Sequence, residues 1–214
     1  MSNLEDYRKS YEKSALLREH LDPNPFQQFR TWFTEVDESG NIDEANAMTV
    51  STLGLDGFPK SRVVLLKSYD ANGFVFYTNY ESEKGKAIQA YNKVCISFFW
   101  PHAERQIIIK GEAHKISSED SDRYFYSRPK GSQLGAFVSP QSQEIEDRKV
   151  LEKRLKALEE EYKENPIKRP ENWGGFCVSP VSFEFWQGRP NRLHDRFVYE
   201  LQDDLDWNIK RLAP

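Results

Sequence analysis

The stretch that decides the fold is Phe183-Glu-Phe-Trp-Gln-Gly-Arg-Pro-Asn-Arg-Leu-His-Asp-Arg196. It begins with alternating aromatic and polar residues, is interrupted by a glycine and a proline, and then resumes. This pattern predicts two strands joined by a tight loop. Side chains two residues apart share one face of a strand, so we expect Arg192, His194 and Arg196 to form one row. Two guanidiniums beside an imidazole repel one another unless an anion lies opposite. The row therefore predicts a binding surface for a planar or phosphorylated ligand, the alternative being a solvated face with an ion pair to Asp195.

The chain before this stretch consists of apolar runs separated by turn residues. Asp56-Gly57 and Asn72-Gly73 between apolar runs are strong hairpin signals. Strands are expected at residues 47–53, 60–69, 74–79, 94–100, 106–116 and 206–212. This order is an antiparallel meander, which predicts a mainly β protein with a barrel or sandwich.

Several helices are expected around these strands. Their patterns cover residues 26–33, 82–91, 118–128 and 144–163. The aromatic residues of the first recur at helical spacing, which predicts core packing. Tyr124 and Arg128 are four residues apart and share a helix face, with Ser132 in the loop beyond.

Composition places the chain among globular proteins with no general affinity for nucleic acid. Its 214 residues fit one domain, and its net charge of −4 gives no basic field that would attract nucleic acid. No apolar run could span a bilayer, and the first residues do not resemble a signal peptide. Cys95 and Cys177 are expected to be free thiols in a reducing cytoplasm. We expect residues 1–20 to be a mobile segment and residues 21–214 to form a single domain.

Common cofactor and metal motifs are absent from the sequence. It contains no Gly-rich phosphate loop, and its four histidines are too scattered to predict a metal site. Arg62 and Lys67 remain as candidate anion ligands, but residues five apart lie on opposite faces of a regular strand. Either a bulge intervenes, or the two side chains serve different anions, or they only flank a buried apolar strand.

The closing stretch and several other segments together resemble the pyridoxamine 5′-phosphate oxidase family, whose enzymes use FMN in vitamin B6 metabolism. The resemblance covers nearly the whole chain. Its other segments are Arg62-Val-Val-Leu-Leu-Lys67, Phe76-Tyr-Thr-Asn79, Glu104-Arg-Gln106, Tyr124 to Gly135, Gln141-Ser142, Trp173-Gly-Gly and the terminal Arg-Leu-Ala-Pro.

The resemblance implies an FMN-binding split β-barrel that forms a homodimer, with FMN between the subunits. It implies oxidation of pyridoxamine 5′-phosphate at its CH–NH2 group, and of pyridoxine 5′-phosphate at its CH–OH group, to pyridoxal 5′-phosphate, with oxygen reduced to hydrogen peroxide. The implied FMN contacts are Arg62, Val63, Val64, Leu65, Leu66, Lys67, Tyr77, Thr78, Lys84, Gln106, Gln141, Ser142, Trp186 and Arg196. The implied substrate contacts are Lys67, Tyr124, Arg128 and Ser132 at the phosphate, Arg192 and His194 over the ring as catalytic residues, and Arg8 and Tyr11 as a lid.

One position departs from the family pattern. The family usually has Ser-Arg-Lys before its short helix, whereas this chain has Ser82-Glu83-Lys84. We expect the carboxylate of Glu83 to weaken FMN binding. Two other classes of function stay open, namely a carrier of flavin or pyridoxal phosphate without turnover and a barrel that binds single-stranded nucleic acid.

Overall fold

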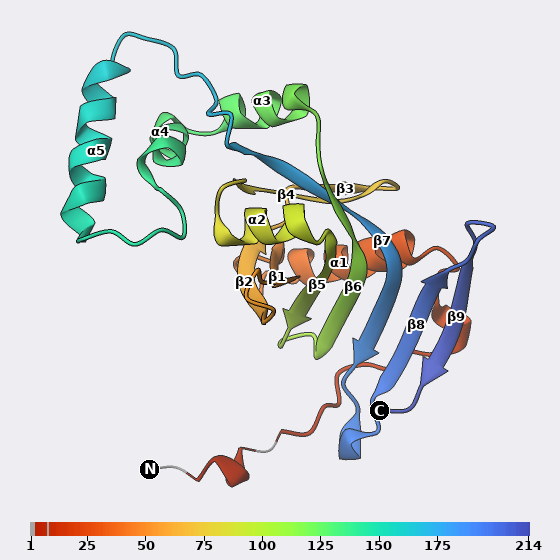
Figure 1. The fold of residues 1–214 in the computed structure, drawn as a ribbon. Coiled ribbons are helices and arrows are strands. Elements are labelled where there is room, and N and C mark those ends of the chain that lie inside the picture. The colour runs from red at the N-terminus through yellow and green to blue at the C-terminus, as the bar shows by residue number, and fades with distance from the viewer. Residues whose placement is uncertain (1–2, 8) are drawn as a thin grey trace. The chain divides into compact units, whose positions relative to one another are not determined.

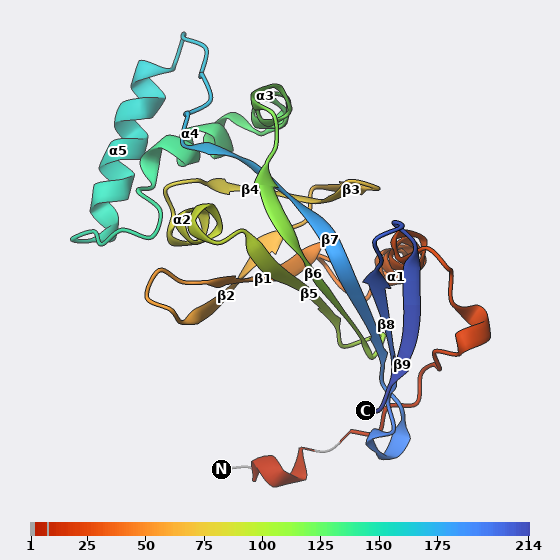
Figure 2. The same cartoon turned by 45° about the vertical axis from the view of Figure 1, so that its right-hand side comes forward.

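The computed structural model describes residues 3–7 and 9–214, and most of its strands pair in antiparallel fashion (Figures 1 and 2). Across this described part, nine strands pair in the order β2-β1-β5-β6-β7-β4-β3, and β8 pairs with β7 and β9. The strands are β1 (Ala47–Leu53), β2 (Pro59–Leu65), β3 (Ser68–Asp70), β4 (Gly73–Asn79), β5 (Lys93–Trp100), β6 (Arg105–Lys115), β7 (Trp173–Gln187), β8 (Asp195–Leu201) and β9 (Trp207–Leu212). The predicted mainly β class is confirmed.

Helices connect the strands at several points. The α-helices are α1 (Pro25–Glu38), α2 (Glu83–Ala90), α3 (Ser118–Ser127), α4 (Lys130–Val138) and α5 (Arg148–Glu161). Short 3-10 turns are η1 (Leu4–Asp6), η2 (Arg18–His20) and η3 (Pro190–Arg192).

The chain divides into two compact units. The first comprises residues 1–50, 95–111 and 180–214, and the second comprises residues 51–94 and 112–179. We describe each unit by itself.

The core of the first unit is built around α1. The side chain of Asn24 caps this helix by accepting the N–H of Phe26 at 2.9 Å, and Pro25 occupies the first turn. Phe29 packs against Phe98 with ring centroids 5.2 Å apart, and Trp32 packs edge-on against Phe185 at 5.3 Å. The predicted core role of these helical aromatics is confirmed.

The alternating aromatics of the deciding stretch lie in β7, as expected. Phe183 and Phe185 are fully buried, whereas Glu184 and Trp186 are only half-buried. β8 continues the ladder, with Phe197 opposite Phe185. β8 and β9 lie side by side in both views (Figures 1 and 2).

The expected row of Arg192, His194 and Arg196 on one strand is wrong, because β8 begins only at Asp195. Arg192 belongs to η3 and has a positive φ of 61°, and its neighbour Asn191 has a φ of 56°. A backbone in this left-handed region turns the chain. Side chains there do not alternate between two strand faces, as the predicted row required. Only Arg196 lies on the strand.

The second unit has a separate hydrophobic cluster where α3, α4 and α5 meet β7. Phe125, Leu134, Ile167 and Trp173 form its buried centre, and side chains of α5 pack around them. Both views place α4 between α3 and α5 (Figures 1 and 2).

Helix α4 corrects the expectation that Ser132 lies in a loop. Pro129 precedes the helix and Leu134 and Val138, four residues apart, are both buried. Gly131 and Gly135 lower the intrinsic helix propensity and hide this pattern in the sequence. Packing of the apolar side chains outweighs that cost.

The strand expected at residues 60–69 is also broken into β2 and β3. Leu66 and Lys67 lie between them, and the Lys67 N–H donates to the carbonyl of Val75 at 2.8 Å. Regular alternation therefore does not run from Arg62 to Lys67, and the opposite-face argument does not apply.

Candidate functional site

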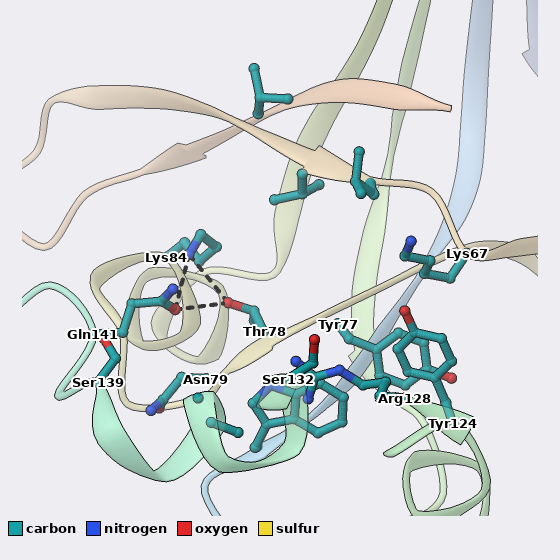
Figure 3. A pocket seen from close by; sticks show the side chains of 16 residues that line it. Lys67, Tyr77, Thr78, Asn79, Lys84, Tyr124, Arg128, Ser132, Ser139 and Gln141 are labelled. Carbon is teal, nitrogen blue, oxygen red and sulfur yellow. Dashed lines mark hydrogen bonds between the residues drawn. The ribbon is translucent and has the colours of Figure 1, made fainter. Parts of the chain in front are cut away.

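A cavity of about 590 Å³ in the second unit gathers most of the predicted ligand-binding residues (Figure 3). The predicted residues that line it are Val63, Val64, Leu65, Lys67, Tyr77, Thr78, Lys84, Tyr124, Arg128, Ser132 and Gln141. They come from β2, β4, the helices α2 to α4 and the connections between these elements. Positive side chains occur at two places in the wall, around Lys84 and around Arg128 (Figure 3).

Lys84 extends from the first turn of α2 into a small polar network. Its Nζ donates to the hydroxyl of Thr78 at 3.2 Å and to the amide oxygen of Gln141 at 3.3 Å (Figure 3). Burial lowers the pKa of Lys84, repulsion from Arg62 lowers it further, and Glu83 opposes both effects. Two mutually repelling, partly desolvated cations favour an anion between them.

Arg128 forms the second positive region. Its guanidinium carbon lies 4.6 Å from the ring centre of Trp173, and burial lowers its pKa. The rings of Tyr77 and Tyr124 stack beside it with centroids 3.9 Å apart. Within the described residues, the Nη1 atom of Arg128 is buried and has no hydrogen-bond partner. Burying a guanidinium nitrogen without a hydrogen-bond acceptor costs free energy, so we expect this nitrogen to bind an anionic ligand.

Three predicted cofactor residues of this unit do not line the cavity. Arg62 donates from Nη1 to the hydroxyl of Thr52 at 2.8 Å, and Leu66 is buried. Ser142 follows Gln141 and has a positive φ of 70°.

The remaining predicted site residues lie in the first unit, where three of their rings cluster. Trp186 and His194 have ring centroids 4.7 Å apart, and Tyr11 lies 5.8 Å from each of them. Gly188 makes room for Tyr11, because a Cβ at position 188 would lie 2.8 Å from its ring. Tyr11 therefore packs against this cluster. The mobility expected for residues 1–20 stays a prediction, and Arg8 lies outside the described residues.

A backbone hydrogen bond fixes the proton on the His194 ring. The N–H of Arg189 donates to Nδ1 at 3.1 Å, so Nδ1 must be unprotonated and the neutral ring carries its proton on Nε2. Burial lowers the pKa of His194, repulsion from Arg192 lowers it further, and Asp195 raises it. His194 is therefore arranged as a neutral donor through Nε2.

The basic residues on either side of His194 differ in their contacts. Arg196 pairs with Glu184 at 2.8 Å and donates to the carbonyl of Ala213 at 2.9 Å. Arg192 makes no ion pair within residues 3–7 and 9–214. Gln106 is half-buried on β6.

The sequence analysis missed the contacts that two buried carboxylates make with the N-terminal segment. Glu104 accepts the N–H of Lys13 at 3.0 Å, and Asp195 accepts the N–H of Leu16 at 3.1 Å. Asp195 also pairs with Arg211. These contacts fasten the N-terminal segment, and no local pattern could have revealed partners 91 and 179 residues away.

Five lining residues were also missed, namely Asn79, Gly135, Ala136, Ser139 and Trp173. Asn79 and Trp173 face each other on β4 and β7. Asn79, Gly135 and Trp173 stand in segments quoted for the family resemblance, which is the signal that could have found them.

Neither a metal centre nor a membrane-spanning helix is found in the part of the chain that the structure describes. No three His, Cys, Asp or Glu side chains gather there as metal ligands. No helix there is both long and apolar enough to cross a bilayer. A cytoplasmic location stays a prediction.

The antiparallel sheet and the cavity lined by cationic side chains indicate a β-barrel protein that binds small molecules. Comparison with known proteins identifies its family. A family model described as "Pyridoxamine 5'-phosphate oxidase" matches residues 35–162. One described as "Pyridoxine 5'-phosphate oxidase C-terminal dimerisation region" matches residues 173–214. The chain belongs to the pyridoxamine 5′-phosphate oxidase family.

Relatives match along their whole length. The chain is 61% identical over 213 residues to the pyridoxine/pyridoxamine 5'-phosphate oxidase of Flavobacterium johnsoniae, covering 100% of both chains. It is 50% identical to the protein of that name from Cyanothece sp., covering 99% of both chains.

Solved structures agree on the fold. The crystal structure of PhzG from Burkholderia lata, in complex with tetrahydrophenazine-1-carboxylic acid, has a TM-score of 0.85 and 27% identity, covering 94% of this chain and 98% of that one. A pyridoxamine 5'-phosphate oxidase-related, FMN binding protein from Nostoc punctiforme has a TM-score of 0.69 and 17% identity, covering 91% and 100%. The predicted split barrel is confirmed.

Proposed function

We propose that this chain is an FMN-dependent oxidase that converts pyridoxamine 5′-phosphate and pyridoxine 5′-phosphate into pyridoxal 5′-phosphate and reduces oxygen to hydrogen peroxide. The observation that carries the proposal is the buried, unpartnered Nη1 of Arg128 in a cavity that also contains Lys84. Two separate cationic places in one cavity fit a phosphorylated cofactor and a phosphorylated substrate.

The residues present fit FMN. Arg62, Lys84, Thr78 and Gln141 offer cationic, hydroxyl and amide donors to its phosphate, and a phosphate beside Arg62 and Lys84 would oppose the lowering of their pKa values by burial. FMN bound here would supply the redox chemistry, as the hydride acceptor for the substrate carbon attached to the pyridine ring and as the two-electron reductant of oxygen. The protein supplies binding, orientation and electrostatics.

The substrate phosphate is assigned to Lys67, Tyr124, Arg128 and Ser132, which line the cavity together. Arg128 brings a guanidinium already oriented by its stacking on Trp173, so little side-chain entropy is lost on binding. The break between β2 and β3 leaves Lys67 at the cavity wall, where it adds a second positive charge.

Arg192 and His194 are assigned to the substrate ring. The positive charge of Arg192 can stabilise negative charge on the ring oxygen. His194 presents a proton on Nε2 while Nδ1 is occupied, so it is arranged to donate a hydrogen bond and not to accept a proton. Tyr11 and Arg8 are assigned to a lid, and the enzyme is assigned to a homodimer with FMN between its subunits.

The test is a flavin bleaching experiment. The FMN-loaded protein should be yellow, should lose its colour when pyridoxamine 5′-phosphate is added without oxygen, and should regain it with peroxide formation when oxygen is admitted. Unphosphorylated pyridoxamine at the same concentration is the matched control and should bleach far more slowly, because Arg128 then lacks its anion. A yellow protein that pyridoxamine 5′-phosphate does not bleach would instead be a carrier.

A further inference from the structure

Glu83, the residue that departs from the family pattern, forms an ion pair in the structure. Its Oε2 lies 2.5 Å from the Nζ of Lys60 on β2. Lys60 and Arg62 are two residues apart on this strand and therefore share a face. Glu83 is also the first residue of α2, next to Lys84.

The charges around Glu83 act on one another. Glu83 raises the pKa of both Arg62 and Lys84, opposing the effect of burial on each. Repulsion from Arg62 also lowers the pKa of Lys84. Three cations and one carboxylate give this group a net charge of about +2, the charge that complements a phosphate monoester dianion.

The ion pair itself adds little to folding stability. The side chains of Lys60 and Glu83 are 57% and 42% exposed, and exposed pairs are weak. What the pair does control is the position of a carboxylate at the N-terminus of a helix, where an anionic ligand is also stabilised. Apart from this pair, Glu83 interacts electrostatically with Arg62 and Lys84.

We propose that Lys60 is a positioning residue of the cofactor-phosphate site, which holds the Glu83 carboxylate so that it does not compete with the phosphate for Arg62 and Lys84. The inference rests on the proposed function for the identity of that phosphate as the one of FMN.

A charge cycle tests the inference. The FMN dissociation constant is measured by quenching of flavin fluorescence for the native protein, Lys60→Gln, Glu83→Gln and the double variant, whose local charges are about +2, +1, +3 and +2. Lys60→Gln should weaken FMN binding about threefold to tenfold, and Glu83→Gln should tighten it by a similar factor. The double variant should bind FMN within about twofold of the native protein, and all differences should shrink in high salt.

Two controls accompany the cycle. Riboflavin, which lacks the phosphate, should bind all four proteins equally. Lys86→Gln removes a lysine of α2 that pairs with Glu81 at 3.5 Å, and it should leave FMN binding unchanged.

Each contrary result has a distinct meaning. An unchanged FMN dissociation constant in Lys60→Gln overturns the inference, and so does a double variant that binds as weakly as Lys60→Gln. Equal losses for riboflavin would show that the substitution disturbs the fold and would also overturn it. A native protein that binds no FMN would overturn the proposed function instead.

Discussion

Arg192 and Arg196 are four residues apart and have different surroundings. Arg196 is held by Glu184 and the Ala213 carbonyl, whereas Arg192 projects from a 3-10 turn with no ion pair in the described residues. Arg192→Ala should keep FMN bound but lower kcat/KM about ten- to hundredfold, the effect of losing a charge-assisted contact of about 1.5–3 kcal/mol. Arg196→Ala should weaken FMN binding, with activity partly restored by excess FMN.

An FMN titration and a rate measurement on each variant separate these roles. Glu184→Gln is the control for Arg196, because it removes the ion pair and keeps the guanidinium. If Arg192→Ala loses FMN as strongly as Arg196→Ala, then the assignment of Arg192 to the substrate is wrong.

His194 should titrate below its ordinary pKa of 6.5 and carry its neutral-state proton on Nε2. The groups that face it are Arg192, Asp195, the Arg189 N–H and the rings of Tyr11 and Trp186. Because the unfolded chain then binds a proton at a higher pH than the folded protein, folding stability should fall as the pH drops through 6.5 towards the lower folded pKa. NMR of 15N-labelled histidine reports the pKa of His194 and the ring nitrogen that carries its proton. A proton on Nδ1 near pH 7 would contradict the prediction.

At the scale of elements, strands and helices with regular patterns were predictable from the sequence. β1 at Ala47–Leu53 and the end of α3 before Pro129 were placed correctly, since period-two alternation and proline act locally. The prediction of one row through Arg192 was wrong, because the positive φ angles at Asn191 and Arg192 cannot be inferred from the alternation of polar and apolar residues. Helix α4 was not predicted, because the tertiary packing of Leu134 and Val138 outweighs the low helix propensity of its glycines.

The candidate site was predicted in a different way from the fold. Spacing alone left Arg62 and Lys67 ambiguous, and the family resemblance supplied most of the residues that line the cavity. What the resemblance could not supply were contacts specific to this chain. The pairing of Glu83 with Lys60, 23 residues earlier, is such a contact.

Close packing of the Tyr80 and Ser121 side chains makes Gly174 in Trp173-Gly-Gly sensitive to substitution. Gly174 lies opposite Thr78, and a Cβ there would overlap the Tyr80 hydroxyl, which donates to the carbonyl of Gly175 at 3.1 Å. Gly174→Ala should lower the free energy of unfolding by about 1–3 kcal/mol through overpacking.

Gly131→Ala in α4 is the matched control for Gly174→Ala. No heavy atom among the described residues lies within 4 Å of its added Cβ, and the helix should gain about 0.5–1 kcal/mol. Urea unfolding of both variants without FMN measures the two changes. A Gly174→Ala protein as stable as the native one would show that the side chains of Tyr80 and Ser121 can move away from the added Cβ without cost.

At the scale of the whole molecule, charge is locally concentrated and not general. The chain has a net charge of −4, yet Lys67, Lys84 and Arg128 all line one cavity. A negative protein with a positive cavity favours small phosphorylated ligands and disfavours a long polyanion, which would meet repulsion outside the cavity. This argues against the reading as a single-strand nucleic-acid binder.

The protein should be a homodimer that FMN strengthens. Residues 173–214 match a dimerisation region, and they expose apolar side chains such as Val181 (47%) and Leu205 (75%). Sedimentation equilibrium should give a mass of about twice 25.1 kDa. Because dimerisation stabilises the folded chain by mass action, the unfolding temperature should rise with protein concentration, and FMN bound between the subunits should reduce that dependence. A monomer that binds FMN as tightly as the dimer would contradict a cofactor site shared by two subunits, since one chain would then supply every contact that the cofactor needs.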